Sequence, residues 1–175
     1  MKKIFIILVA ILATISCKPK VDFNKLMDAD YAAAVSEYPD SVVNFYEVET
    51  VLDKPITSID KELNVSTSTT IIQVGNKVKQ IDRTFKNNRV QKENVTYNNG
   101  WWVGDLPIPL DSVKLNFNDA VQRLRETNTV LPETSFMTFR KPASPPFETY
   151  YIFGSEKTFY LFVDAITGEV TGGTE

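Results

Sequence analysis

The C-terminal stretch from Tyr150 to Val170 constrains the fold of this chain more than any other. Two aromatic and β-branched runs, 150–153 and 159–163, flank a loop of hairpin length, and a turn at 164–168 precedes a short closing run. The second run is apolar on both of its alternating faces, which is typical of a strand covered on both sides. We therefore expect an antiparallel hairpin whose second strand is buried by other parts of the chain. The alternative is that one aromatic face of this strand forms a ligand platform.

The middle of the chain also reads as strands. A run rich in Val, Phe and Tyr at 41–52 predicts one long strand. Asn and Gly pairs then punctuate four further strand candidates, because these residues supply the positive φ that tight hairpins need. These candidates are 66–74, 77–85, 89–97 and 101–103. Many positions on them are polar, so we expect an antiparallel meander with one face in water.

Two helices complete the expected elements. Asp22 is a suitable N-cap for a helix that runs to about Glu37, and apolar residues recur along it at steps of three and four. Asn116 can cap a second helix that ends near Thr127. Between the strands and this second helix, the Pro-rich segment 105–114 is the best candidate for a linker, because proline fixes φ and removes a backbone donor.

The C-terminal third resembles a known module. Its order is helix, strand at 135–141, Pro-rich break and terminal hairpin, and it ends in Phe-Val-Asp-Ala-Ile-Thr-Gly-Glu-Val at 162–170. This order and ending resemble the PepSY module, a small domain of protease propeptides and bacterial envelope proteins, over Leu115–Gly173. The resemblance implies a structural turn formed by Asp164, Thr167 and Gly168. It also implies a role in restraining or chaperoning peptidases, with no catalytic residues.

The N-terminal half has the same order of elements, a helix followed by antiparallel strands. Tandem halves of this kind resemble β-lactamase-inhibitor-like proteins. We therefore expect an α+β fold in which a helix packs on an antiparallel sheet, with two tandem PepSY-like halves as a further option. The expected divisions are a signal peptide at 1–16, a tether at 17–21, an N-terminal half at 22–104, the linker at 105–114 and the PepSY-like part at 115–175.

The first residues read as an export signal. Met1-Lys2-Lys3 is a positive start, and the apolar run 4–15 is shorter than the ~20 residues that a spanning helix needs. Thr14–Cys17 resembles a bacterial lipobox, in which Cys17 is lipid-modified. This resemblance predicts a lipid-anchored protein of the bacterial cell envelope, on the periplasmic or surface face of the outer membrane. An ordinary secretory signal with an incidental cysteine is the alternative.

Several functional classes are excluded or disfavoured by composition. The chain contains no histidine and one cysteine. Catalytic pairs of a nucleophile with a histidine are therefore excluded, and so are metal sites built on histidine. We expect no enzyme, no cofactor and no metal. The one catalytic arrangement that the composition leaves open is a glycosidase-like carboxylate pair, Glu47 and Glu49, on one side of a strand. Without residues 1–16 the charge is 17 bases minus 22 acids, or −5, which argues against nucleic acid as a partner.

Two features are candidate binding surfaces. Trp101 and Trp102 follow a hairpin turn, and on a strand their indoles would face opposite sides. A basic cluster on the meander, with candidates Lys77, Lys79, Arg83 and Arg89, could attract an anionic partner, although such a cluster is also typical of a solvated face. We therefore predict a non-catalytic, lipid-anchored protein that binds an envelope protein or peptidase. The alternative is a carbohydrate-binding accessory lipoprotein that uses exposed aromatic side chains.

Two short patterns suggest a modification. Asp40-Ser41-Val42 and Asp111-Ser112-Val113 resemble the O-glycosylation acceptor of some bacteria that are rich in envelope lipoproteins. Patterns of three residues often occur by chance. Glycosylation at Ser41 and Ser112 therefore stays a hypothesis, which the intact mass of native protein would test.

Overall fold

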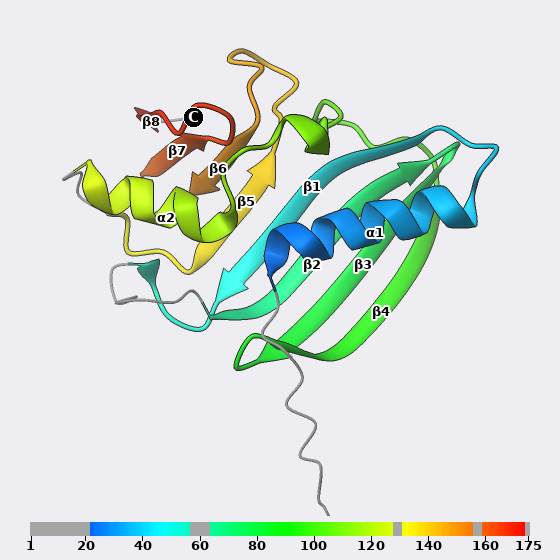
Figure 1. Ribbon diagram of the computed structural model, residues 1–175, viewed down its shortest axis with the longest axis horizontal. Coiled ribbons are helices and arrows are strands. Elements are labelled where there is room, and N and C mark those ends of the chain that lie inside the picture. The colour runs from blue at the N-terminus through cyan, green and yellow to red at the C-terminus, as the bar shows by residue number, and fades with distance from the viewer. Residues whose placement is uncertain (1–21, 57–63, 128–130, 156–158, 174–175) are drawn as a thin grey trace, which may run out of the picture.

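The computed structural model describes residues 22–56, 64–127, 131–155 and 159–173, and every structural statement below concerns these residues (Figure 1). Cys17 and the predicted signal and tether lie outside them. Within the described residues, none of the helices has the length and apolar character to span a membrane.

A helix followed by four strands occurs twice along the chain. The first set comprises α1 (Phe23–Glu37), β1 (Val43–Leu52), β2 (Val65–Val74), β3 (Lys77–Lys86) and β4 (Arg89–Asn99). After a short 3-10 helix, η2 (Leu110–Ser112), the second set comprises α2 (Phe117–Glu126), β5 (Phe136–Arg140), β6 (Tyr150–Phe153), β7 (Tyr160–Asp164) and β8 (Val170–Gly173).

All eight strands form one antiparallel sheet in the order β4-β3-β2-β1-β5-β6-β7-β8. The two sets of four strands join in the middle, where β1 pairs with β5 and Glu47 lies opposite Arg140. β4 and β8 are therefore the two edges of the described sheet (Figure 1).

The expected α+β fold class is wrong. The described chain is dominated by a single eight-stranded sheet with two α-helices, not by helix-plus-sheet halves that stand as separate modules. The physical reason is the pairing of β1 with β5, which continues one hydrogen-bonded ladder through both sets of strands. The strand expected at 101–103 is also wrong, because these residues form no strand.

The two helices begin where the sequence predicts. The Asp22 carboxylate accepts hydrogen bonds from the backbone of Asn24 and Lys25, which satisfies donors that the first helical turn leaves unpaired. Asn116 and Asp119 form a reciprocal capping box at the start of α2. The buried residues of α2 lie at i, i+3, i+4 and i+7: Phe117, Ala120, Val121 and Leu124.

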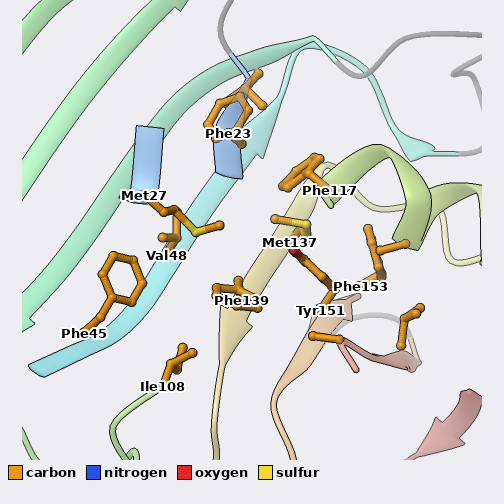
Figure 2. Packing of buried hydrophobic residues seen from close by; sticks show 14 of the residues in the cluster. Phe23, Met27, Phe45, Val48, Ile108, Phe117, Met137, Phe139, Tyr151 and Phe153 are labelled. Atoms are coloured by element: carbon orange, nitrogen blue, oxygen red, sulfur yellow. The ribbon is translucent and has the colours of Figure 1, made fainter. Parts of the chain in front are cut away.

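Both helices lie on the same face of the sheet, which we call the helix face (Figure 1). On this face, alternate apolar side chains of the strands pack with the helices in one core. Figure 2 shows side chains of α1 and α2 facing those of β1, β5 and β6, and the labelled members include Phe23, Met27, Phe45, Val48, Phe117, Met137, Phe139, Tyr151 and Phe153. A single core therefore extends under both helices.

The starts of the two helices meet over the middle of this core. The Phe23 ring stacks on the Phe117 ring with centroids 5.3 Å apart. The Tyr151 hydroxyl donates to the Leu115 carbonyl oxygen at 2.8 Å and accepts a hydrogen bond from Asn24 Nδ2 at 3.4 Å. Burial raises the pKa of Tyr151 well above its usual range, so the phenol stays a neutral donor. Aromatic packing and hydrogen bonds thus hold α1 and α2 to one strand.

The Pro-rich segment 105–114 connects β4 to α2. Ile108 lies in the core, and its backbone N–H donates to the Phe45 carbonyl oxygen at 2.7 Å. Asp105 forms an isolated bridge with Pro142. The segment thus contributes to packing as well as connecting two elements. The division of the chain into domains at this segment stays a prediction.

Candidate functional site

We call the face of the sheet opposite the helices the open face. A bulge in β1 determines which residues of this strand lie on it. The register of β1 against β2 shifts between Phe45 and Glu47. Phe45 and Val48 belong to the helix-face core, whereas Tyr46 packs with Ile71 in a separate cluster. A bulge breaks the strict alternation of a strand, so Tyr46 and Glu47 both lie away from the helices.

A loop after β4 folds back over this face. Gln73 is 1% exposed, and its side chain donates to the carbonyl oxygens of Gly75 and Gly100, both at 3.0 Å. Its Oε1 accepts from the Trp102 backbone at 2.8 Å. The Trp102 indole Nε1 then donates to Asp105 Oδ2 at 3.2 Å. One buried amide therefore fixes the loop that carries Trp102 and Asp105.

Asp105 belongs to a charged cluster at the centre of the open face. Asp105 Oδ1 lies 3.9 Å from Arg140 Nε, and Glu47 is opposite Arg140 in the β1–β5 pair. Burial, aided by the negative charges of Asp105 and Glu49 and opposed by Arg140, raises the pKa of Glu47 to about 7. Burial likewise raises the pKa of Asp105. Glu47 thus titrates near neutrality.

A cavity of about 700 Å³ lies beside this cluster, between the open face of the short strands and the Pro-rich loop that follows β5. Arg140, Tyr150 and Phe162 come from the sheet, and Pro145 and Pro146 come from the loop. Its volume falls in the ~300–1,000 Å³ range of ligand pockets, and its lining combines rings with a few polar groups, as such pockets do.

The sequence indicated no cavity here, although an aromatic ligand platform on the strand at 159–163 was an alternative prediction. The visible signals of the cavity were the break at 142–146 and the strand at 159–163 with aromatic residues on both faces. The structure places Leu161 and Val163 in the helix-face core and Phe162 in the cavity lining. The Pro-rich loop thus covers part of the second face of this strand.

Two of the predicted basic residues are buried in ion pairs. The Arg83 guanidinium donates to both carboxylate oxygens of Asp30, at 2.7 and 2.6 Å, and to Glu93 Oε2 at 2.6 Å. Lys79 Nζ donates to Glu37 Oε2 at 2.9 Å. Both cations hold α1 to the sheet, so the predicted anion-attracting surface is not presented by Lys79 or Arg83.

The other predicted basic residues lie nearer the edge of the sheet. Lys77, at the start of β3, is exposed, and Arg89, at the start of β4, is half-buried. Exposed Lys86 and Lys92 lie on the same two strands. Exposed basic side chains therefore lie at both ends of β3 and on β4, and they differ in part from those predicted.

The two tryptophans have different surroundings. Trp101 is 68% exposed, whereas Trp102 packs against Tyr46, Ile71 and Val78. Of the pair, Trp101 alone presents a broad free surface, and a role in sugar or protein binding stays a prediction for it. Glu49 is exposed on β1 while Glu47 is buried.

The predicted turn after β7 is held by hydrogen bonds from backbone N–H groups to side-chain oxygens. Asp164 Oδ1 accepts from the backbone of Ile166 and Thr167, both at 2.7 Å, and Thr167 Oγ1 accepts from the Glu169 backbone at 3.2 Å. Gly168 has φ +76°, and a Cβ there would lie 3.1 Å from Arg123 Nε. The contacts of Asp164, Thr167 and Gly168 within this turn are those of a structural element.

Comparisons with known proteins give one structural relative. No protein-family model matches the chain, and no curated protein matches it in sequence. The fold is similar to the crystal structure of a predicted lipoprotein (CD1622) from Clostridium difficile 630, with a TM-score of 0.54. The similarity covers 89% of this chain and 94% of the other, at 12% identity. At this identity the comparison supports a shared fold.

Proposed function

We propose that this chain is a non-catalytic, lipid-anchored envelope protein that binds a partner protein along the outer edge of β4. The anchor would be the lipobox-like Cys17, and the lipoprotein description of the structural relative supports this reading. The non-catalytic part rests on a sequence without histidine, in which the single cysteine is the anchor. The partner would be another envelope protein, with the peptidases that the PepSY resemblance suggests among the candidates.

The observation that carries the proposal is the length and exposure of β4. This strand spans Arg89–Asn99, lies at one end of the strand order and is exposed from Gln91 onward. An edge strand presents a row of backbone donors and acceptors, to which an extended segment of another chain can add as a further strand. The opposite edge, β8, offers four residues.

Charge indicates the kind of segment that would bind. The exposed side chains of Lys77, Lys86 and Lys92 lie on β3 and β4, whereas Glu93 is engaged by Arg83. Positive charge along an edge favours an acidic extended segment and speeds its encounter. Edge lysines also protect sheets from pairing with other chains, and the test below separates these two roles.

The test uses a synthetic acidic peptide of alternating Val and Glu residues, with a Val and Lys peptide of equal length as its counterpart. Hydrogen exchange followed by NMR reports on each backbone amide. We expect the acidic peptide to protect outward-facing amides of β4, and to bind less tightly as salt is raised. Binding that leaves β4 amides unprotected, or no binding at all, would contradict the proposal.

A charge reversal sharpens this test. Lys92→Glu on β4 should weaken binding of the acidic peptide, whereas Lys54→Glu, an exposed residue just after β1, should leave it unchanged. Loss of one exposed charge pair corresponds to about a two- to five-fold change in Kd. Equal effects of the two substitutions would indicate that net charge alone, and not β4, governs binding.

The anchor is tested separately. Wild-type protein expressed in a lipoprotein-processing bacterium should partition into the detergent phase with a mass increased by acyl chains. Cys17→Ser should remain unprocessed and lack that added mass. Detection of wild-type protein cleaved elsewhere, without acyl chains, would overturn the lipid anchor and leave the peptide test of β4 unaffected.

A further inference from the structure

The cavity on the open face has aromatic walls. The rings of Tyr150 and Phe162 meet edge to face with centroids 5.6 Å apart, and the Tyr160 ring lies 6.5 Å from that of Phe162. Pro145 and Pro146 bound the cavity on the loop side. Such walls suit an apolar stem, and the electron-rich ring faces attract a cation.

Carboxylates lie next to Tyr150, behind the residues that line the cavity. The Tyr150 hydroxyl donates to Glu148 Oε2 at 3.3 Å, and Asp164 lies opposite Tyr150 in the β6–β7 pair. Burial, together with the negative charges of Glu148, Asp164 and Glu169, raises the pKa of Tyr150 to about 12. These three carboxylates therefore act on the same point of the cavity wall.

Arg140, on the other side of the cavity, also has carboxylates beside it. Arg140 lines the cavity, and its charge opposes the upward shifts in the pKa of Glu47 and Asp105. Lys141 follows it in the chain and is half-buried. Asp105 lies 3.9 Å from Arg140 and Glu47 titrates near neutrality, so the acidic excess beside the cavity comes from Glu148, Asp164 and Glu169 on the Tyr150 side.

We propose that this cavity binds a cationic ligand, a primary ammonium or guanidinium group carried on an apolar stem. The stem would lie against Phe162 and the prolines, and the charged head would lie near Tyr150 and Glu148. A cation over aromatic rings with carboxylates nearby gains from both interactions. The same carboxylates would repel an anionic ligand.

This chemistry occurs in a free alkylamine and in the Lys or Arg side chain of a peptide. The probes are n-butylammonium and n-butylguanidinium as small cations, and lysine capped at both ends as a peptide mimic. Butyrate and n-butanol are the anionic and neutral counterparts of matched size. Binding is measured by NMR shifts of the full ectodomain. Tighter binding of capped lysine than of n-butylammonium assigns the site to peptide side chains, and the reverse assigns it to free amines.

We expect the cations to bind and to shift the amides around Tyr150 and Phe162, with butyrate failing to bind. Glu148→Gln removes one exposed carboxylate and should weaken cation binding by about two- to five-fold. Glu133→Gln, an exposed residue before β5 and away from the cavity lining, should leave it unchanged.

A second variant tests the aromatic wall. Phe162→Leu keeps an apolar side chain but removes the ring, so cation binding should fall while the far-UV spectrum is retained. Butyrate binding as tightly as n-butylammonium, shifts that map outside the cavity, or equal affinities of Glu148→Gln and wild type would each overturn the proposal.

Discussion

The two sets of four strands within one sheet differ in length and in what covers them. β1 to β4 have 10, 10, 10 and 11 residues, whereas β5 to β8 have 5, 4, 5 and 4. The long strands end in an exposed edge, while the short strands are bordered by the Pro-rich loop and form a cavity. The long strands thus end in the edge to which the proposed partner would add, and the short strands with their long loop enclose the cavity of the proposed ligand.

The two helices attach to the sheet by different forces. α1 contributes Asp30 and Glu37 to ion pairs with Arg83 and Lys79 of β3. α2 attaches through a continuous apolar stripe, Phe117, Ala120, Val121 and Leu124. The predictions below test whether this difference is energetic as well as geometric, beginning with the largest effect.

Asp30→Ala should destabilise the protein by about 3–5 kcal/mol, because it leaves the Arg83 cation buried with Glu93 as its remaining partner. The free energy of unfolding is measured in urea. Asp28→Ala, an exposed residue of the same helix, is the control and should change stability by less than about 0.5 kcal/mol. A loss for Asp30→Ala as small as that for Asp28→Ala would remove the distinction between the helices.

Leu124→Ala should cost about 3 kcal/mol, because Leu124 is fully buried and its truncation leaves a cavity. Since no charge is involved, this loss should be nearly the same at low and high salt. Gln122→Ala, on the exposed side of α2, serves as the control. A marked dependence of the Leu124→Ala effect on salt would contradict an apolar attachment of α2.

Glu47→Gln should stabilise the protein at alkaline pH. The folded-state pKa of Glu47 is raised to about 7 from 4.5, so the protonated form is favoured by folding. Its contribution is fully present below pH 4.5 and is lost as pH rises through 7. Glutamine does not titrate, so the variant should gain up to about 3 kcal/mol over wild type above pH 7 and little below pH 4.

Urea unfolding measured from pH 4 to pH 9 checks this difference. Glu49→Gln should give a smaller gain in the same direction, because the Glu49 charge contributes to the shift in the Glu47 pKa. Glu133→Gln should show no gain. A stability difference between Glu47→Gln and wild type that stays constant with pH would contradict the raised pKa.

The smallest effect is expected at Trp101. Trp101→Ala should alter the free energy of unfolding by less than about 0.5 kcal/mol, because the side chain is 68% exposed. Trp102→Ala should cost clearly more, since it removes packing on Tyr46 and the hydrogen bond to Asp105. Equal losses for the two substitutions would show that Trp101 has a structural contact.

Local signals in the sequence located most elements. Side-chain caps at Asp22 and Asn116 act within three residues, so they mark the helix starts without knowledge of the rest of the fold. Hairpin turns rich in Asn and Gly act over similar distances and located the long strands; Asn87 and Asn88 have positive φ, as tight turns require.

Contacts between distant residues could not be predicted in this way. The burial of Arg83 depends on Asp30, 53 positions away, and the loop conformation of Trp102 depends on Gln73 in β2. The single sheet depends on β1 pairing with β5, strands between which β2, β3, β4 and α2 lie in the sequence. Patterns of charge and hydrophobicity identify such residues but do not reveal their partners.

The start of α1 at Phe23 sets how far this protein can stand from a bilayer. If Cys17 carries the lipid, the Asp22 cap is five residue steps further along the chain, and an extended chain spans at most about 18 Å over that length. With the proposed anchor, a tether of that length would hold the folded part of the chain close to the lipid headgroups. A partner would then approach along the plane of the membrane, which would favour proteins held at the same surface.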